Sequence, residues 1–228
     1  MRMADVNSAY YPYERVYDYA TLPHAEEIFS KVVNYLLDLP ERGYTPRDDN
    51  SLPRCRLMKL LYWDEEYPLE KPLPTPTQKT NLVFDPDRPD LPPDKERQYR
   101  ILPFMYPGQV AEYIGRTSLK IYMGKAKMTN SFRIDQAVTF EILTNSAFEG
   151  NVQQRSLSRT YDIAVDILRS LNGVNMDGVG SWYFDRRQLT DCGLEPIWDK
   201  AMNVGYLLTM GLTFMGGEGV DPYNPYLG

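Results

Sequence analysis

Proline is concentrated in one part of this chain and restricts what that part can form. Thirteen of the 18 prolines lie between Pro40 and Pro107. Proline fixes its own φ angle, lacks a backbone donor and pushes the preceding residue out of the helical region. Helices and most strand pairing are therefore not expected over Leu69–Pro93, where aspartates add further turn signals. We predict a Pro-rich extended arm over residues 56–99.

This arm has few apolar side chains with which to hold itself in place. Leu73 and the run Leu82–Phe84 are its main anchors, and burying four side chains does not offset the conformational entropy lost by ordering the whole segment. A loop of this length is uncommon in a compact domain unless a partner orders it. We therefore expect the arm to lie on an adjacent subunit and to be mobile in an isolated one. A disordered linker is the alternative.

Residues 1–55 are predicted to be an N-terminal extension with one amphipathic helix at about residues 22–38. Pro23 suits a first helical turn, and Glu26 and Glu27 lie near the positive end of the helix dipole. The apolar residues in this stretch recur with the three- and four-residue spacing of one helix face: Ala25, Ile28, Phe29, Val32 and Leu36. The next apolar run, Arg56–Trp63, fits either a strand or one helical turn.

Residues 100–215 have the pattern of a compact core domain. Ile101–Phe104 and Leu119–Met123 are candidate strands, and Phe132–Ile142 alternates apolar and polar residues with a period of two. The residues of that strand expected to face the core are Phe132, Ile134, Val138, Phe140 and Ile142. Those expected to face water or a partner are Arg133, Asp135, Thr139 and Glu141.

A helix is predicted next, and two further strands come after it. Ser156 or Ser158 is its N-cap and Asn172-Gly173 its C-terminal stop, with an apolar stripe of Tyr161, Ala164, Val165, Leu168 and Leu171. The strands are Ser181–Phe184 and Val204–Met215. The resulting β-β-α-β-β order predicts an α+β fold in which an antiparallel β-sheet carries one packed helix. Residues 216–228 are predicted to be a C-terminal tail that docks on a neighbour.

The composition excludes several classes of protein. A formal net charge of −6 argues against a general nucleic-acid binder. One histidine and two cysteines provide neither a Cys₄ nor a Cys₂His₂ zinc site, and no disulfide framework, which favours a reducing compartment. No segment approaches the roughly 20 apolar residues of a membrane span, and residues 1–13 lack the apolar core of a signal peptide. The 18 tyrosines suit either an interface or a Tyr-rich core.

Catalytic patterns are missing from the sequence. It has no P-loop, no dinucleotide-binding fingerprint and no nucleophile elbow. His24 is interpreted as a solvated helix residue, and the basic pairs Arg186-Arg187 and Lys125/Lys127 as exposed hairpin residues. The acidic run Asp64–Glu66 offers oxygen ligands for a divalent cation, but a solvated turn before a proline is preferred. We therefore predict no catalytic, cofactor-binding or metal-ligating residues.

Four segments, in order along the chain, resemble a known family. They are Leu60–Lys79, Arg100–Gly108, Ser118–Met123, and the stretch from Phe132–Ile142 through Arg159–Leu168. Together they span most of Arg56–Phe214. The family is that of small virion proteins of the tailed-bacteriophage neck, the tail-terminator and head–tail connector proteins. The N-terminal helix, the Pro-rich arm and the C-terminal tail depart from its smaller members and leave open which ring of the neck is formed.

The resemblance implies a structural protein with a small α+β fold, and not an enzyme. Such proteins form rings, commonly sixfold, that end the tail tube or join it to the head portal. The expected partners are other copies of the chain, in a ring of about six, together with adjacent neck or connector proteins and tail-tube or sheath proteins. DNA would pass through the channel without specific binding, which an acidic chain suits.

The same resemblance implies synthesis in the bacterial cytoplasm and a final location in the virion neck, without a cofactor or a membrane partner. Two other functions stay open. One is a capsid-decorating or host-interaction module, in which the arm binds a shell lattice or a cellular partner. The other is a metal-dependent hydrolase that uses Asp64, Glu65 and Glu66.

Overall fold

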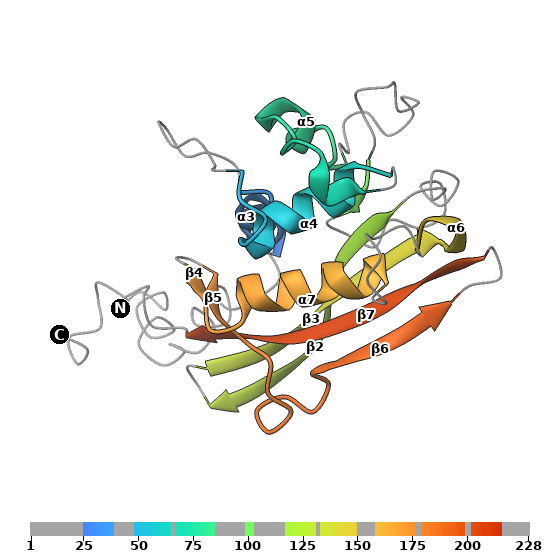
Figure 1. Ribbon diagram of the computed structural model, residues 1–228. Helices are drawn as coiled ribbons and strands as arrows, with labels where there is room; N and C mark the ends of the chain where they lie inside the picture. The colour runs from blue at the N-terminus through green and yellow to red at the C-terminus, as the bar shows by residue number, and fades with distance from the viewer. Residues whose placement is uncertain are drawn as a thin grey trace, which may run out of the picture.

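The structure is a computed structural model that describes residues 25–38, 48–64, 67–84, 99–102, 117–130, 133–149, 158–176, 179–198 and 202–215. These residues form helices and a curled sheet with mainly antiparallel pairing (Figure 1). The predicted α+β class, with an antiparallel-dominated sheet, is therefore confirmed.

The sheet has the strand order β1-β2-β3-β7-β5-β4, and β6 also pairs with β7. The strands are β1 Ile101–Leu102, β2 Ser118–Asn130, β3 Arg133–Asn145, β4 Asn175–Met176, β5 Gly180–Tyr183, β6 Gly193–Trp198 and β7 Asn203–Met215. The central pair is β3 with β7, which runs from Arg133↔Met215 to Asn145↔Asn203 without a shift in register. β1 pairs with β2 in parallel.

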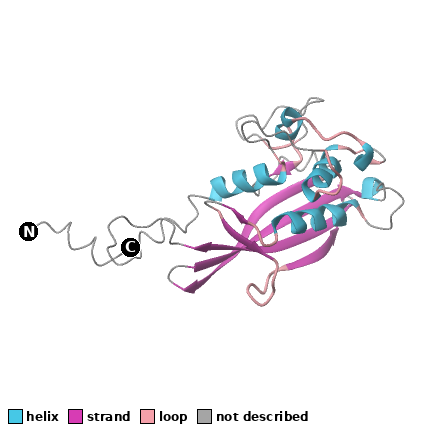
Figure 2. Cartoon of the chain, turned by 60° about the vertical axis from the view of Figure 1, so that its left-hand side comes forward, coloured by secondary structure: helices cyan, strands magenta, loops and turns pink. Residues whose placement is uncertain are grey.

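The helices lie to one side of this sheet in the views of Figures 1 and 2. They are α3 Ala25–Leu36, α4 Pro53–Tyr62, the short 3₁₀ helix η2 Pro68–Glu70, α5 Pro76–Thr80, α6 Ser146–Glu149 and α7 Arg159–Leu171. One hydrophobic cluster joins side chains from α3, α4, α7 and the sheet. No described helix has the length and apolar character needed to cross a membrane.

The alternation predicted for the long strands is found on the helix side of the sheet. Val138, Phe140 and Ile142 of β3 are buried, and Leu208 and Met210 of β7 are fully buried beside them. These residues belong to the same cluster as Ile163 and Ile167 of α7. Burial of such side chains contributes roughly 1.5–3 kcal/mol each, so the centre of the core lies between β3, β7 and α7.

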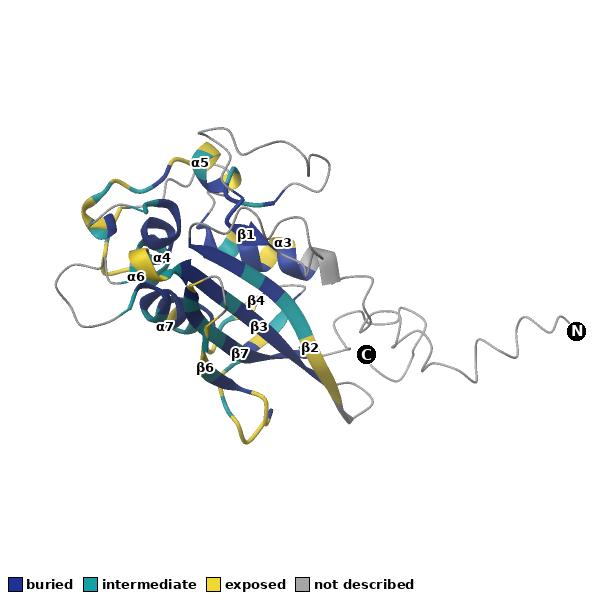
Figure 3. Ribbon diagram, turned by 90° about the vertical axis from the view of Figure 1, so that its right-hand side faces the viewer, coloured by how far each residue is buried: buried dark blue, intermediate teal, exposed yellow. Residues whose placement is uncertain are grey.

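The opposite face of β3 was expected to contact water or a partner, and that expectation is wrong for two residues. Asp135 and Thr139 are buried, and Figure 3 shows β3 mainly in the colour of buried residues. Asp135 accepts a hydrogen bond from Thr213 on β7, and the Thr139 hydroxyl lies 3.1 Å from that of Thr209. The segment between β5 and β6 contributes Leu189 and Cys192 to a small cluster on Ala137 of β3. That segment therefore covers part of the face.

Local sequence signals explain where α7 begins and ends. Ser158 is the N-cap, and its hydroxyl accepts a hydrogen bond from the backbone N–H of Tyr161 at 3.2 Å. Gly173 comes after the helix with a φ of +82°, a conformation that glycine adopts without steric cost. The cap predicted at Ser156 or Ser158 is thus Ser158, and Asn172-Gly173 is the predicted stop.

The apolar stripe predicted for α7 is partly wrong. Ile163 and Ile167 are fully buried, whereas Val165 and Leu168 are only half-buried. Ala164 and Leu171 are buried as expected. The difference arises because α7 has neighbours on more than one side: it contacts β3 and β7 and also α4. A single stripe facing a sheet does not describe such a helix.

The prediction that no helix forms over Leu69–Pro93 is also wrong, because α5 lies within that stretch and η2 overlaps its start. Pro53, Pro68 and Pro76 are each the first residue of a helix, namely α4, η2 and α5. Proline is tolerated there because the missing N–H has no partner in the first turn and the fixed φ already suits a helix. The open choice at Arg56–Trp63 is resolved as the greater part of a ten-residue helix, α4.

The described part of the arm packs on its own chain. Leu82 is fully buried and Phe84 nearly so. The Trp63 indole donates a hydrogen bond to the backbone oxygen of Pro72 at 3.0 Å, and the Leu73 N–H donates to Asp48 at 3.0 Å. The prediction that Leu82 and Phe84 must contact another subunit is therefore wrong, because Leu82 belongs to the main hydrophobic cluster of the same chain and Phe84 clusters with Tyr99 and Leu102. Docking of the arm on an adjacent subunit stays a prediction.

Other predictions are met, missed or lie outside the described residues. α3 buries Ile28, Phe29, Val32 and Leu36 as expected. The strand β6 is absent from the predicted order, because the glycine at its start indicates a loop. The following lie outside the described residues: His24, Glu65, Glu66, residues 85–98 of the arm, Pro103, Phe104, Phe132 and the tail 216–228.

Candidate functional site

The C-terminal end of α4 is the point where three distant parts of the chain meet. The Arg159 guanidinium, from α7, donates hydrogen bonds to the backbone oxygens of Leu60 (3.2 Å) and Trp63 (2.7 Å). Arg100, just before β1, donates to the backbone oxygen of Leu61 at 2.5 Å. The last carbonyls of a helix have no partner within it and carry its negative dipole end. Two buried arginines therefore supply the missing donors.

Asp64 completes this arrangement as the ion-pair partner of Arg100. Its two carboxylate oxygens accept hydrogen bonds from the two terminal nitrogens of Arg100, at 2.8 Å and 2.6 Å. The Arg100 side chain is 2% exposed and that of Asp64 18%. Such a bidentate pair is among the stronger polar contacts in proteins. Burial lowers the pKa of Arg159 nearby, and Asp64 and Glu149 partly oppose this.

This geometry bears on the metal site considered for Asp64–Glu66. Both oxygens of Asp64 face a guanidinium, which occupies the place that a cation would take. Within the residues that the structure describes, no group of three or more histidine, cysteine, aspartate or glutamate side chains is arranged to hold a metal. The two arginines and Asp64 thus join the elements that meet at the end of α4.

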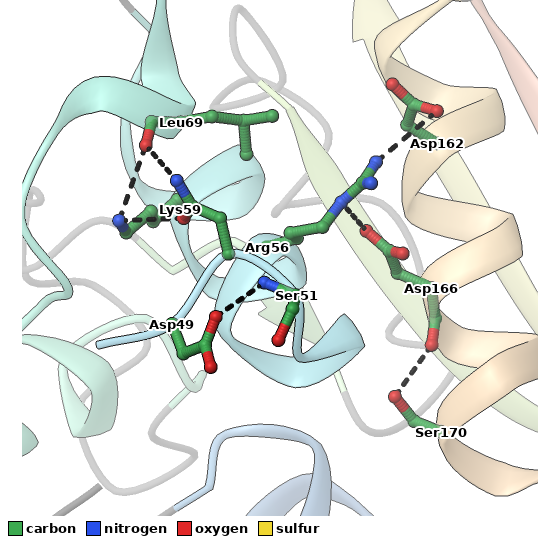
Figure 4. A network of polar contacts seen from close by, with 9 residues as sticks. Asp49, Ser51, Arg56, Lys59, Leu69, Asp162, Asp166 and Ser170 are labelled. Atoms are coloured by element: carbon green, nitrogen blue, oxygen red, sulfur yellow. Dashed lines mark hydrogen bonds and ion pairs between the residues drawn. The ribbon is translucent and has the colours of Figure 1, made fainter. Parts of the chain in front are cut away.

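A second polar cluster lies along the contact between α4 and α7 (Figure 4). The Nε of Arg56, on α4, donates to Asp166 Oδ2 on α7 at 3.1 Å, and a terminal nitrogen of Arg56 lies 3.7 Å from Asp162 Oδ1. One turn later, the Ser170 hydroxyl donates to the backbone oxygen of Asp166 at 2.7 Å. We call Arg56, Asp162 and Asp166 the α4–α7 seam.

Lys59 holds the segments before and after α4 against that helix. Its ammonium lies 2.7 Å from Asp48 and donates to Asn50 at 2.9 Å and to the backbone oxygen of Leu69 at 3.4 Å. Partial burial alone would raise the pKa of Asp48, but the hydrogen bonds from Lys59 and from the Leu73 N–H lower it overall. Figure 4 shows Lys59 of α4 directed at Leu69, and Arg56 of the same helix directed at Asp162 and Asp166 of α7.

Among the described residues, the two most exposed large apolar side chains lie close in sequence, at the end of β6 and just before β7. Trp198, the last residue of β6, is 76% exposed, and Met202, just before β7, is 71% exposed. Trp198 pairs with Val204 in the sheet, and the backbone oxygen of Met202 accepts a hydrogen bond from the Ser146 N–H at 3.0 Å. We call Trp198 and Met202 the apolar tip. It offers contact area to a partner and no chemical group for catalysis.

The basic residues singled out in the sequence do not form a binding site with one another. Lys125 and Lys127 are exposed on the distal half of β2. Arg187 is 94% exposed, whereas Arg186 donates a hydrogen bond to the backbone oxygen of Cys192 at 2.8 Å. The predicted exposure is thus confirmed for Arg186 and Arg187 and for Lys125 and Lys127. The structure does not bring the two pairs into contact in any hydrogen bond or ion pair between described residues.

Sequence reasoning missed Arg56, Arg100, Arg159 and Asp166, which organise the polar contacts of the fold. Each lies within or beside an apolar run. A charged residue in such a place is either exposed or paired when buried, and this is the signal that points to them. Comparisons with protein-family models, with curated proteins and with solved structures give no match for the chain.

Proposed function

We propose that this chain is a structural protein of the tailed-bacteriophage neck. In this proposal, copies of the chain form a ring that ends the tail tube or joins it to the head portal, and DNA passes through the channel without specific binding. The ring contains about six copies, in keeping with closed cyclic assembly. The protein is made in the bacterial cytoplasm and becomes part of the virion.

The observation that carries the proposal is how the four family-like segments lie relative to one another. The first provides the end of α4 with Asp64, the second provides Arg100, and the fourth provides β3 and Arg159. Arg100 and Arg159 both donate to the end of α4. The third segment forms the first half of β2, which pairs with β3 from Ser118↔Leu143 to Met123↔Val138. The four segments therefore belong to one connected unit of the fold, and this connection supports the proposal.

We propose further that this unit is the β-β-α-β-β fold that the resemblance implies. Its members in chain order are β2, β3, α7, β5 and β7, and the short strand β4 and the edge strand β6 are additions to it. The shared hydrophobic cluster of α7 with β3 and β7 supports this proposal. The helices α3 and α4 extend the same cluster, and α3 belongs to the N-terminal extension by which the chain departs from the smaller family members.

The apolar tip is the surface that we assign to contacts within the particle. Trp198 and Met202 expose an indole and a thioether to water in one copy, and aromatic residues and methionine are enriched where proteins meet. The neighbour across this contact is another copy of the chain, an adjacent neck or connector protein, or a tail-tube or sheath protein. We propose no enzymatic activity and no cofactor.

Gold labelling of particles tests the location. A small tag is placed in the loop between β5 and β6, at Gln188, which is exposed, and tagged virions are labelled and imaged. We expect label at the single vertex where head and tail join. Label over the whole capsid would instead support the capsid-decorating module, and label at the distal tail would support a host-interaction module. A particle carrying the same tag on its major capsid protein is the control for access of the label.

A further inference from the structure

Asp166 is a carboxylate that the fold buries without fully satisfying it. Its side chain is 1% exposed. Oδ2 accepts the hydrogen bond from Arg56 Nε at 3.1 Å, but Oδ1 is buried and has no hydrogen-bond partner among the described residues. A buried polar atom without a partner loses its hydration and gains nothing in return. Burial at this place therefore disfavours the charged form of Asp166 more than the neutral form, because a charge loses more hydration than an O–H group.

The charges around Asp166 do not compensate for that loss. From α4, Arg56 faces it, but the same guanidinium also attracts Asp162 at 3.7 Å. From α7 itself, Asp162 repels the charged form and Arg169 attracts it. From α3, the Tyr35 hydroxyl donates to the backbone oxygen of Ser170 at 3.1 Å and carries no charge. Burial is the largest effect, and it raises the pKa of Asp166 to about 7.

We propose that the α4–α7 seam is a proton-operated latch, in which protonation of Asp166 holds α4 closed on α7 and loss of that proton loosens it. This inference is independent of the proposed neck function, because it concerns two helices of one chain. The neutral carboxyl group keeps Oδ2 as an acceptor for Arg56 Nε and has lost the charge that burial disfavours. The charged carboxylate needs a partner for Oδ1, and opening the seam to water supplies one.

The direction of the pH effect follows from linkage. Between the ordinary pKa of an aspartate and the raised pKa in the fold, the folded state binds more protons than the unfolded state. Stability therefore falls as the pH rises through this interval and levels off above it. An acidic group stabilised by an ion pair would show the opposite slope. Because Asp166 links α4 to α7, we expect the loss to be concentrated in those two helices.

Hydrogen exchange of the full chain at pH 6 and pH 8.5 tests the latch, after correction for the intrinsic pH dependence of exchange. In the wild type we expect protection of the α4 amides to fall by about tenfold or more at the higher pH, since each unit of pKa shift corresponds to a factor of ten. The variant Asp166→Asn, which cannot ionise, should keep its protection at both pH values. Unchanged wild-type protection, or a pH dependence retained in Asp166→Asn, would overturn the proposal.

Asp162→Asn is the matched control, because it removes a charge from the same seam and keeps the carboxyl group of Asp166. It should retain the pH-dependent step but move it to lower pH, since a repelling charge is lost. If Asp166→Asn does not fold, the ¹³C carboxyl resonance of Asp166 in the wild type decides. A titration midpoint near 7 supports the latch, and one below about 5, the ordinary range for aspartate, contradicts it.

Discussion

Replacing Arg100 by methionine should be among the most damaging changes at the end of α4. The substitution Arg100→Met keeps much of the apolar volume but removes the donors to Leu61 and Asp64. Removing one member of a buried ion pair costs about 3–5 kcal/mol, because the other charge is left without compensation. Asp64 is 18% exposed and regains some hydration. We therefore expect a loss of about 3 kcal/mol in the free energy of unfolding, at the low end of that range.

A double-mutant cycle separates the ion pair from other effects. Asp64→Asn keeps one acceptor for Arg100 and should cost about 2 kcal/mol, and the two changes together should cost about 2 kcal/mol less than their sum, because the residues are in direct contact. Urea unfolding, with and without Mg²⁺, measures all four proteins. An Arg100→Met variant within about 0.5 kcal/mol of the wild type would refute the reasoning. A cost of Asp64→Asn that appears only with Mg²⁺ would restore the metal-ligand hypothesis.

Three further predictions use other parts of the structure. Ser158→Ala removes the N-cap of α7 and should lower stability by about 1 kcal/mol in thermal unfolding, whereas Ser158→Asp should restore it. Gly205→Ala places a Cβ against the backbone oxygen of Ile142. Because this pushes β7 away from β3, it should lower the free energy of unfolding by about 1–3 kcal/mol. Equal urea midpoints of the variant and the wild type would contradict the close approach of the two strands. Trp198→Ser at the apolar tip should leave unfolding unchanged within about 0.5 kcal/mol but weaken self-association, as sedimentation at several concentrations would show.

The long strands could be predicted from the sequence because their environment is simple. Along β3 and β7, alternate residues face one hydrophobic cluster, so a period of two appears directly in the order of residues. The start of α7 was also predictable, since Ser158 can cap only the helix that begins after it. These features depend on neighbours along the chain or on one uniform face, and single-sequence reasoning captures both.

The helices α4 and α5 were harder to predict than α3, because proline has opposite meanings at different positions. Pro53 and Pro76 begin α4 and α5, whereas the same residue inside a helix would break it. The distinction depends on the residues that come after the proline. From Arg54 to Tyr62 the run has helix-forming residues without another proline. That run is a sufficient signal for α4, but the density of nearby prolines obscures it.

The polar contacts could not be predicted because their partners lie far apart in sequence. Arg159 and Leu60 are separated by 99 positions, and Arg56 and Asp166 by 110. In the sequence each charged member is an ordinary residue of an amphipathic helix. Only the packing of α7 against α4 shows that Arg159 is buried and that its charge is directed at the end of a helix.

The central claim is that copies of this chain close into a ring, and native mass spectrometry of the full chain tests it most directly. The chain is measured alone and then with tail-tube protein, over a range of concentrations. The account predicts a discrete species of about six times 26.4 kDa, which loses subunits in the Trp198→Ser variant. A species of 26.4 kDa alone, at every concentration and with the tail-tube protein present, would contradict it.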